Sequence, residues 1–127
     1  MKLGLDYDGV INKLPRFFSI LTKLFVAAGH EVHIITGNRG TAEFLKNLKK
    51  MGISYTHFFS ISDYHHGIGT PMTGYEENHT WIAEDLWDRT KGNYCAEHGI
   101  DLHVDDSPVY GKYFRTPYLY FSLSKAA

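Results

Sequence analysis

Two aspartates separated by a single residue stand near the start of the chain. They are Asp6 and Asp8, in the run Leu3-Gly4-Leu5-Asp6-Tyr7-Asp8-Gly9-Val10. The partly apolar residues ahead of Asp6 predict a buried strand, and Gly9 allows the backbone to turn directly after it. A turn at this place can bring both carboxylates to one point, where they suit a divalent cation and one reacting group. Considered alone, Asp8-Gly9 is also typical of a hairpin turn.

Three further positions extend this candidate site. The pair Asp105-Asp106 follows another short strand-like run, Thr36 ends a third, and Lys91 precedes the acidic pair. Each has a structural explanation when it is taken singly, as a turn or as a surface lysine. However, Asp6, Thr36 and Asp105 all end predicted strands, and ligands of parallel sheets lie beyond the carboxyl ends of the strands. This conjunction favours a functional site.

These residue types suit phosphate-ester chemistry. A carboxylate can attack phosphorus and form an aspartyl-phosphate, which splits one difficult displacement into two steps. Because the ester is itself negatively charged, a hard cation such as Mg²⁺ is needed, and a hydroxyl and a lysine can add further donors. Thr36 and Lys91 are the candidates for these donors. A second acid can protonate the leaving oxygen and later activate water, which is the role that we assign to Asp8.

In their order along the chain, these motifs resemble those of the haloacid dehalogenase-like (HAD) hydrolase superfamily. Four segments carry the resemblance, which spans nearly the whole chain: Asp6-Tyr7-Asp8-Gly9-Val10, Ile34-Ile35-Thr36-Gly37, Lys91, and His103-Val104-Asp105-Asp106. The first is similar to the motif that supplies the nucleophile and the general acid/base. The second resembles the motif with a phosphate-binding threonine, the third the lysine motif, and the fourth the acidic motif that helps to bind Mg²⁺.

The resemblance implies a Mg²⁺-dependent phosphatase that hydrolyses a phosphorylated substrate through an aspartyl-phosphate on Asp6. It assigns catalysis to Asp6 and Asp8. It implies that the substrate phosphate is bound by Thr36, Gly37, Asn38 and Lys91. It also implies that the metal ion is bound by Asp6, Asp8, Asp105 and Asp106. In this family the nucleophile binds the metal through its side chain and the second aspartate through its backbone carbonyl. Lys112 is an alternative to Lys91, and the choice between Asp105 and Asp106 as the direct ligand stays open.

Members of this family usually carry a cap, inserted after the first or the third strand. The segment from Asn12 to Pro15 leaves no room for the first kind, and the stretch from Ser62 to Asn78 is too short for a full cap of the second kind. A minimal, largely uncapped member is therefore expected. Its open site would suit a macromolecular or extended phosphorylated substrate, or a small one covered by a neighbouring subunit.

The pattern of strands and helices predicts a single α/β domain over residues 1–127. Strands are expected ahead of Asp6 and over Glu31–Thr36, His57–Ile61, Asp101–Asp105 and Tyr118–Phe121. Helices are expected from Pro15 to Gly29, over Thr41–Met51, around Trp81 to Leu86, and as a short separate helix up to Gly99, with a long loop over Ser62–Asn78. Each link is too long for a hairpin, so crossovers and a mostly parallel five-stranded sheet follow, in a three-layer α/β/α, Rossmann-like domain. The first helix should pack an apolar stripe against the core: Phe17, Phe18, Ile20, Leu21, Leu24 and Phe25.

The composition narrows the class of protein. Of 127 residues, 43% are hydrophobic and 21% charged, and the net charge of −1 creates no strong field toward nucleic acid or an anionic membrane. An enzyme that acts on a phosphorylated nucleic-acid end stays open. The one cysteine, Cys95, allows no intrachain disulfide. With no secretory leader pattern and no apolar run of the ~20 residues that a membrane helix needs, a cytoplasmic protein without membrane contact is expected.

The chain is rich in histidine, with eight residues, and four of them bracket the long loop: His57, His65, His66 and His79. A zinc site is conceivable there, but the spacing matches no common ligand signature. His65 and His66 could contact a substrate phosphate or could be exposed loop residues. His33 and His103 lie inside strands and are interpreted as structural.

Two rival functions come from other classes. A receiver domain would need its phosphorylated aspartate after the third strand, where this chain has His57-Phe58-Phe59-Ser60-Ile61. A catalytically silent relative that binds a phosphorylated ligand or a partner remains an alternative, as does phosphotransfer to an acceptor other than water. The sequence leaves the identity of the substrate and the oligomeric state open.

Overall fold

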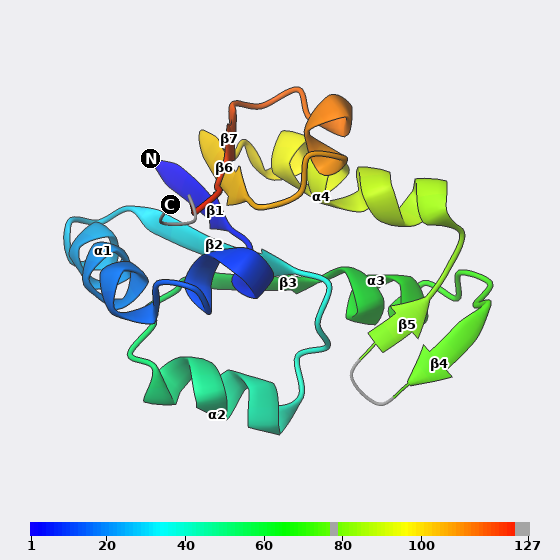
Figure 1. Ribbon diagram of the computed structural model, residues 1–127, viewed down its shortest axis with the longest axis horizontal. Coiled ribbons are helices and arrows are strands. Elements are labelled where there is room, and N and C mark those ends of the chain that lie inside the picture. Colours follow the sequence, from blue (N-terminus) through cyan, green and yellow to red (C-terminus); the bar gives the residue numbers. More distant parts are fainter. Residues whose placement is uncertain (77–78, 124–127) are drawn as a thin grey trace.

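The computed structural model describes residues 1–76 and 79–123 and is built around one parallel sheet (Figure 1). Its strands lie in the order β3-β2-β1-β6-β7. They are β1 (Lys2–Leu5), β2 (Glu31–Thr36), β3 (His57–Ser60), β6 (Leu102–Asp105) and β7 (Tyr118–Tyr120). Every neighbouring pair is parallel. The predicted three-layer α/β fold with a five-stranded sheet is confirmed.

Helices cover both faces of this sheet. The helices α1 (Pro15–Ala27) and α2 (Ala42–Lys50) lie on one side, and α4 (Glu84–His98) lies on the other (Figure 1). The side chains of β2 alternate accordingly, because successive residues of a strand point to opposite faces. Val32 and Ile34 belong to the core cluster beneath α1 and α2, whereas Ile35 packs with Tyr94 and Cys95 of α4.

The two helices that follow β1 and β2 begin where the sequence places suitable residues. Pro15 opens α1, where its missing N–H costs nothing, and Gly29 ends the following turn with a positive φ of 86°. The hydroxyl of Thr41 caps α2 by accepting the N–H of Phe44 at 3.1 Å. These local signals explain why the helix boundaries follow the prediction closely.

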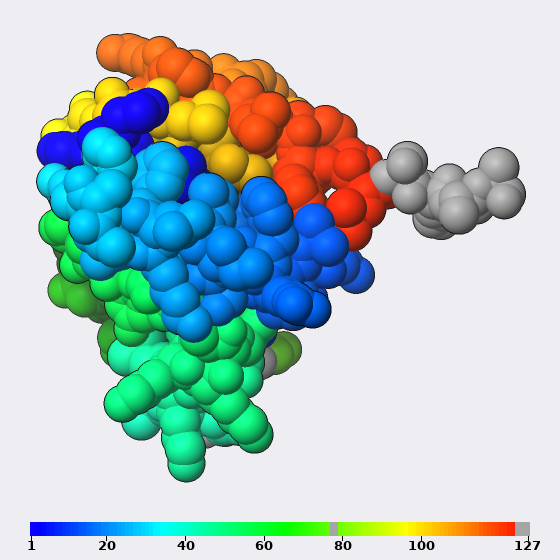
Figure 2. All heavy atoms as spheres, turned by 90° about the vertical axis from the view of Figure 1, so that its left-hand side faces the viewer, coloured from blue at the N-terminus to red at the C-terminus, as the bar shows by residue number. Residues whose placement is uncertain are grey.

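The apolar stripe of α1 is only partly buried, which corrects the expectation that it forms core. Phe18 is buried, and Leu21 and Phe25 pack against the core cluster, but Phe17 and Leu24 are 54% and 64% exposed. Figure 2 faces this side of the molecule, where α1 forms the middle of the surface above α2. The apolar stripe of α1 is wider than the part of the helix that the sheet can cover.

No helix within the described ranges has the length and apolar character to cross a membrane.

The segment expected to be a loop over Ser62–Asn78 has its own secondary structure. It contains α3 (Ile61–Gly67) and β4 (Gly74–Glu76), and β4 pairs antiparallel with β5 (His79–Trp81). Ser60 starts α3 by accepting the N–H of Asp63 at 3.0 Å. Of the glycines and proline in this segment, Gly69 and Pro71 separate the two elements, whereas Gly67 ends α3 and Gly74 begins β4. Asn78 lies outside the described residues.

A single long helix, α4, replaces the two helices expected between Trp81 and Gly99. Trp81 belongs to β5, and the helix runs without interruption through Thr90-Lys91-Gly92. Gly92 is a packing residue and not a helix break. A Cβ at this position would stand 2.5 Å from the carbonyl oxygen of Tyr113, in the short helical turn η2 (Tyr110–Tyr113).

Candidate functional site

The carboxyl ends of three adjacent strands bring the predicted site residues to one edge of the sheet. Asp6 directly follows β1, Thr36 ends β2, and Asp105 ends β6. β1 lies between β2 and β6, so the sheet grows toward β3 on one side of β1 and toward β7 on the other. Ligands of open α/β sheets usually bind at such a switch point, beyond the carboxyl ends of the strands. The N–H of Asp6 donates to the carbonyl of Val104 at 3.0 Å and fixes the backbone here.

Lys91 joins two of these carboxylates. Its Nζ atom lies 2.9 Å from Oδ1 of Asp6 and 2.8 Å from Oδ2 of Asp105. All three residues are buried, so the ion pairs are weakly screened by solvent. Lys112, the alternative lysine, instead lies with its Nζ 5.3 Å from the centre of the Tyr113 ring. The structure thus brings Lys91 to the acidic residues.

The charges of this cluster shift the pKa values of its members in different directions. Burial, together with the charge of Asp105, raises the pKa of Asp6 from its ordinary value of 3.8 to about 7, although Lys91 opposes the shift. Burial alone would raise the pKa of Asp105, but the hydrogen bond from His103 and the charge of Lys91 outweigh it and lower that pKa to about 2. Burial likewise disfavours a charged Lys91, yet the two carboxylates raise its pKa above the ordinary value. The site therefore holds a protonated lysine beside an ionised Asp105.

Two residues with no predicted role at the site, His103 and Ser107, hold Asp105 in place. Nε2 of His103, which is fully buried, donates to Oδ2 of Asp105 at 2.9 Å. The N–H of Ser107 donates to Oδ1 at 3.1 Å. The sequence predicts only a structural role for His103, although its position two residues before Asp105 puts both side chains on the same strand face.

Three carboxylates are suitably grouped to hold a cation. Oxygen atoms of Asp6, Asp105 and Asp106 lie within 4.8 Å of one another. Asp106 is exposed, and repulsion by Asp105 adds to partial burial in raising its pKa. Gly9 leaves room for it, because a Cβ at Gly9 would stand 1.8 Å from Oδ2 of Asp106. A set of carboxylate oxygens with one open side fits Mg²⁺, which prefers oxygen ligands and retains waters.

Asp8 lies in the turn after β1, and its side chain contacts Asn38. Oδ2 of Asp8 accepts a hydrogen bond of 2.6 Å from the side-chain amide of Asn38. The same amide donates to the hydroxyl oxygen of Thr36 at 3.0 Å, and the backbone N–H of Asn38 donates to it at 3.1 Å. Asn38 thus connects the predicted acid/base residue with the predicted phosphate-binding threonine.

Aromatic side chains support the loop after β2, and the sequence analysis assigned them no part in the site. Gly37 lies against Trp87, since a Cβ there would stand 2.7 Å from the indole ring. The indole N–H of Trp87 donates to the hydroxyl of Tyr110 at 2.8 Å, and Nζ of Lys91 lies 5.0 Å from the centre of the Tyr110 ring. These contacts join residues far apart in the chain, so no local spacing pattern could have indicated them.

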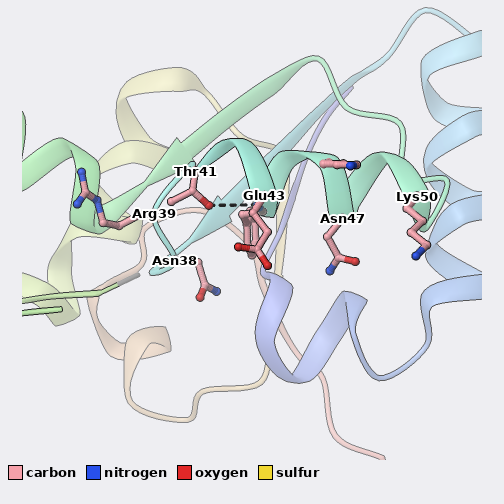
Figure 3. A pocket seen from close by; sticks show the side chains of 8 residues that line it. Asn38, Arg39, Thr41, Glu43, Asn47 and Lys50 are labelled. Carbon is pink, nitrogen blue, oxygen red and sulfur yellow. Dashed lines mark hydrogen bonds between the residues drawn. The ribbon is translucent and has the colours of Figure 1, made fainter. Parts of the chain in front are cut away.

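An open pocket of about 540 Å³ adjoins Asn38 along α2 (Figure 3). It is lined by polar and charged residues and one phenylalanine: Asn38, Arg39, Thr41, Glu43, Phe44, Lys46, Asn47 and Lys50. Asn38 and Asn47 point to the same side of α2, and the amide of Asn47 donates to the Tyr7 hydroxyl at 3.2 Å. The pocket thus begins beside the Asp8–Asn38 contact.

The antiparallel pair β4–β5 occupies the place where a cap of the second kind would be inserted. It lies beyond α3 at the carboxyl end of the sheet (Figure 1). Tyr75 of β4 stacks against the guanidinium of Arg39 at 5.5 Å, and His79 lies 4.7 Å from Trp87, ring centre to ring centre. The pair therefore borders the loop after β2, while an open, uncapped site stays a prediction.

The histidines near the expected loop have separate environments. His65 is buried, with Nδ1 2.8 Å from the Thr70 hydroxyl and Nε2 2.8 Å from the Thr90 hydroxyl, so it connects α3 with α4. His66 is exposed. His57 lies on β3 beside Glu31 and His33. The structure does not bring these histidines together as one zinc site.

Comparisons of the chain with models of protein families, with curated proteins and with solved structures yield no match.

Proposed function

We propose that the protein is a Mg²⁺-dependent phosphomonoester hydrolase that works through an aspartyl-phosphate on Asp6, as its resemblance to HAD hydrolases implies. One observation carries the proposal. Asp6 and Asp105 share the buried ammonium of Lys91 at 2.9 and 2.8 Å, at the edge of the sheet where ligands of α/β domains bind. A purely structural ion-pair cluster has no need of the additional exposed acid Asp106 or of the Asp8–Asn38 contact beside it.

In the first step, a carboxylate oxygen of Asp6 attacks phosphorus and forms an acyl-phosphate bond. The bond between phosphorus and the ester oxygen breaks, and that oxygen takes a proton from the carboxylic acid of Asp8. Asn38 holds Asp8 by its hydrogen bond of 2.6 Å, and the loop of Thr36, Gly37 and Asn38 supplies donors for the phosphoryl oxygens.

In the second step, the carboxylate of Asp8 takes a proton from water, and the water oxygen attacks phosphorus. The acyl-phosphate bond breaks, which releases inorganic phosphate and restores the carboxylate of Asp6. Lys91 stays protonated and offers its charge to the phosphoryl group throughout, because Asp6 and Asp105 raise its pKa.

Asp6, Asp105 and Asp106 are the residues that would hold Mg²⁺, and the backbone of Asp8 is a further ligand implied by the family resemblance. A bound Mg²⁺ supplies the positive charge that lets an anionic carboxylate approach an anionic phosphate. The polar pocket beside Asn38 is our candidate for the part of the substrate beyond the phosphate. The single buried thiol of Cys95 fits a protein of the cytoplasm, where we place this activity.

The test is hydrolysis of an aryl phosphate by the wild type and by Asp6→Asn, each with Mg²⁺ and with a chelator. We expect phosphate release that requires Mg²⁺ and is lost in the variant. Activity that survives Asp6→Asn contradicts the assigned nucleophile. If neither protein releases phosphate from a broad panel of monoesters, while phosphate still binds, the chain is a phosphate-binding protein without turnover.

A further inference from the structure

A second group of metal-ligand side chains lies on the α4 face of the sheet, away from the carboxylates at the strand ends. It consists of Glu31 and His33 of β2 and of His57 of β3. Glu31 and His33 are two residues apart on one strand and therefore point to the same face. His57 is the register partner of His33 on the neighbouring edge strand, so all three side chains meet at one place.

The distances among these side chains are those of a compact ligand set. Oε1 of Glu31 lies 2.8 Å from Nε2 of His33 and 3.7 Å from Nδ1 of His57, and all three ligand atoms fall within 4.8 Å of one another. Donor atoms around one zinc ion stand roughly 3 to 3.6 Å apart, because each bond is about 2.0–2.2 Å long. The Glu31–His33 distance is close to that spacing, whereas His57 has to move closer.

We propose that Glu31, His33 and His57 bind one divalent transition-metal ion of the zinc class. Two imidazoles and one carboxylate form a ligand set that zinc uses in proteins, with a fourth position left for water or another donor. Imidazole nitrogens favour zinc and its neighbours over Mg²⁺, which selects oxygen ligands. This chemistry separates the group from the all-carboxylate cluster of Asp6, Asp105 and Asp106.

Tyr94 of α4 is hydrogen-bonded to the ring nitrogen of His33 that does not face Glu31. His33 is buried, and its Nδ1 atom is hydrogen-bonded to the Tyr94 hydroxyl at 2.7 Å, which leaves Nε2 facing Glu31. A hydroxyl can accept a hydrogen bond as well as donate one, so it suits the ring form that binds a metal through Nε2. Such partners orient the imidazole and strengthen it as a ligand.

One ring has to rotate for both imidazoles to reach the same ion. The rings of His33 and His57 are stacked, with centres 4.1 Å apart and an angle of 6° between their planes. The ligand electron pairs lie in those planes and cannot converge in this arrangement. His57 is the ring that can turn, because its side chain is 47% exposed and its Nδ1 lies 2.8 Å from the hydroxyl of the neighbouring Thr56 and 3.7 Å from Glu31. An ion bound here would join the edge strand β3 to β2 and so stabilise the folded chain.

The test is calorimetric titration of the tag-free full chain with Zn²⁺ in excess Mg²⁺, which occupies carboxylate sites. We expect one zinc ion per chain in the wild type and in His66→Ala, a control that removes an exposed histidine outside the group. His57→Ala and Glu31→Gln should each weaken binding by about tenfold or more. Both alter partly exposed side chains, and circular dichroism checks that each variant is folded.

Two further readouts separate ligation from incidental binding. Tyr94→Phe keeps the packed ring and removes the hydroxyl, so it should weaken binding by about 10- to 100-fold. Co²⁺ in place of Zn²⁺ should give visible absorption bands that His57→Ala changes and His66→Ala does not. Equal zinc binding by the wild type, His57→Ala and Glu31→Gln overturns the proposal, and so does the absence of zinc binding by the wild type.

Discussion

The Nζ atom of Lys91, in the middle of α4, lies 2.9 Å from Oδ1 of Asp6 at the end of β1, and both side chains are buried. With Asp105 on the other side of the ammonium, two carboxylates share one positive charge. A second positive charge is missing when both acids are ionised, and it can come from a proton or from a metal ion. The stability of the fold and the proposed catalysis therefore depend on the same three side chains.

Asp6→Asn should stabilise the protein at alkaline pH in a Mg²⁺-free buffer. The pKa of Asp6 is raised in the folded state, from 3.8 to about 7, so the folded chain binds a proton more tightly than the unfolded chain. The stability associated with Asp6 is therefore complete below about pH 4 and is lost as the pH rises through 7. The neutral amide avoids this loss, and we expect a melting temperature higher than that of the wild type by several degrees at pH 8.

The difference in melting temperature between the two proteins should shrink at pH 5, where Asp6 is protonated in the folded wild type. Thermal unfolding followed by circular dichroism at both pH values measures it. A variant that is less stable than the wild type at pH 8 would contradict the raised pKa of Asp6.

Lys91→Met should destabilise the fold strongly at pH 8. The methionine side chain has nearly the same length as that of lysine but carries no charge. The buried carboxylates of Asp6 and Asp105 then have no ammonium group between them. Removing one partner of a buried ion pair typically costs about 3–5 kcal/mol, because a buried charge is left uncompensated. Urea unfolding measures the free energy of unfolding. The cost should be smaller at pH 5, because Asp6 is then already protonated in the folded wild type and Lys91 neutralises only Asp105.

Lys112→Met is the matched control for this variant, since Lys112 is exposed and lies against the Tyr113 ring. We expect it to change the free energy of unfolding by less than about 1 kcal/mol. Equal losses in the two variants would show that the Lys91 ion pairs contribute no particular stability.

The fold could be predicted from the sequence because its signals are local. Apolar runs mark the strands, Pro15 and Thr41 mark helix starts, and the carboxyl ends of parallel strands must share one edge. That rule predicts that Asp6, Thr36 and Asp105 lie together, and the strand order brings them to one edge. Sequence alone leaves Lys91 and Lys112 as alternatives, and the fold brings Lys91 to Asp6 and Asp105.

The features of the fold and the site that the sequence does not predict depend on contacts between segments far apart in the chain. Gly92 interrupts a helical pattern in the sequence, but in the fold it allows close approach to the carbonyl of Tyr113. The strand pair β4–β5 is short, and a three-residue strand has too few residues to show an alternating pattern. The cluster of Glu31, His33 and His57 arises from strand register, which the spacing of residues along one chain does not reveal.

Gly9→Ala should weaken Mg²⁺ binding at the carboxylate cluster. The added Cβ would stand 1.8 Å from Oδ2 of Asp106, and the backbone here has a φ of 76°, which side chains disfavour. Asp106 must therefore leave its present position in the group with Asp6 and Asp105. Calorimetric titration with Mg²⁺ measures the affinity, which should fall by about tenfold or more, a loss of about 1.4 kcal/mol in binding free energy.

Gly29→Ala separates the effect of the clash from that of the backbone. Gly29 has a similar φ of 86°, but a Cβ there would meet no other atom within 4 Å. Both variants should lose some stability, whereas only Gly9→Ala should lose Mg²⁺ affinity. An unchanged affinity in Gly9→Ala would mean that Asp106 is not required to hold the ion.

Asn38→Ala should lower the rate of the proposed hydrolysis with little effect on folding. The Asn38 amide donates to Asp8 at 2.6 Å and to Thr36 at 3.0 Å, so its loss leaves the acid/base residue without its fixed position. Misplacement of a catalytic group by about 1 Å can cost about 100-fold in rate, and we expect a fall in kcat approaching that size. Steady-state kinetics with an aryl phosphate measures kcat and KM separately.

Asn47→Ala is the control for Asn38→Ala, because Asn47 lines the same pocket but donates to the hydroxyl of Tyr7 at 3.2 Å. It removes an amide of the same size without touching Asp8 or Thr36, and kcat should stay within about twofold of the wild type. If both variants raise KM and leave kcat unchanged, Asn38 binds substrate and does not position Asp8. If only Asn38→Ala lowers kcat, the Asn38 amide acts on the reacting groups, because the two variants differ in the residues that their amides contact.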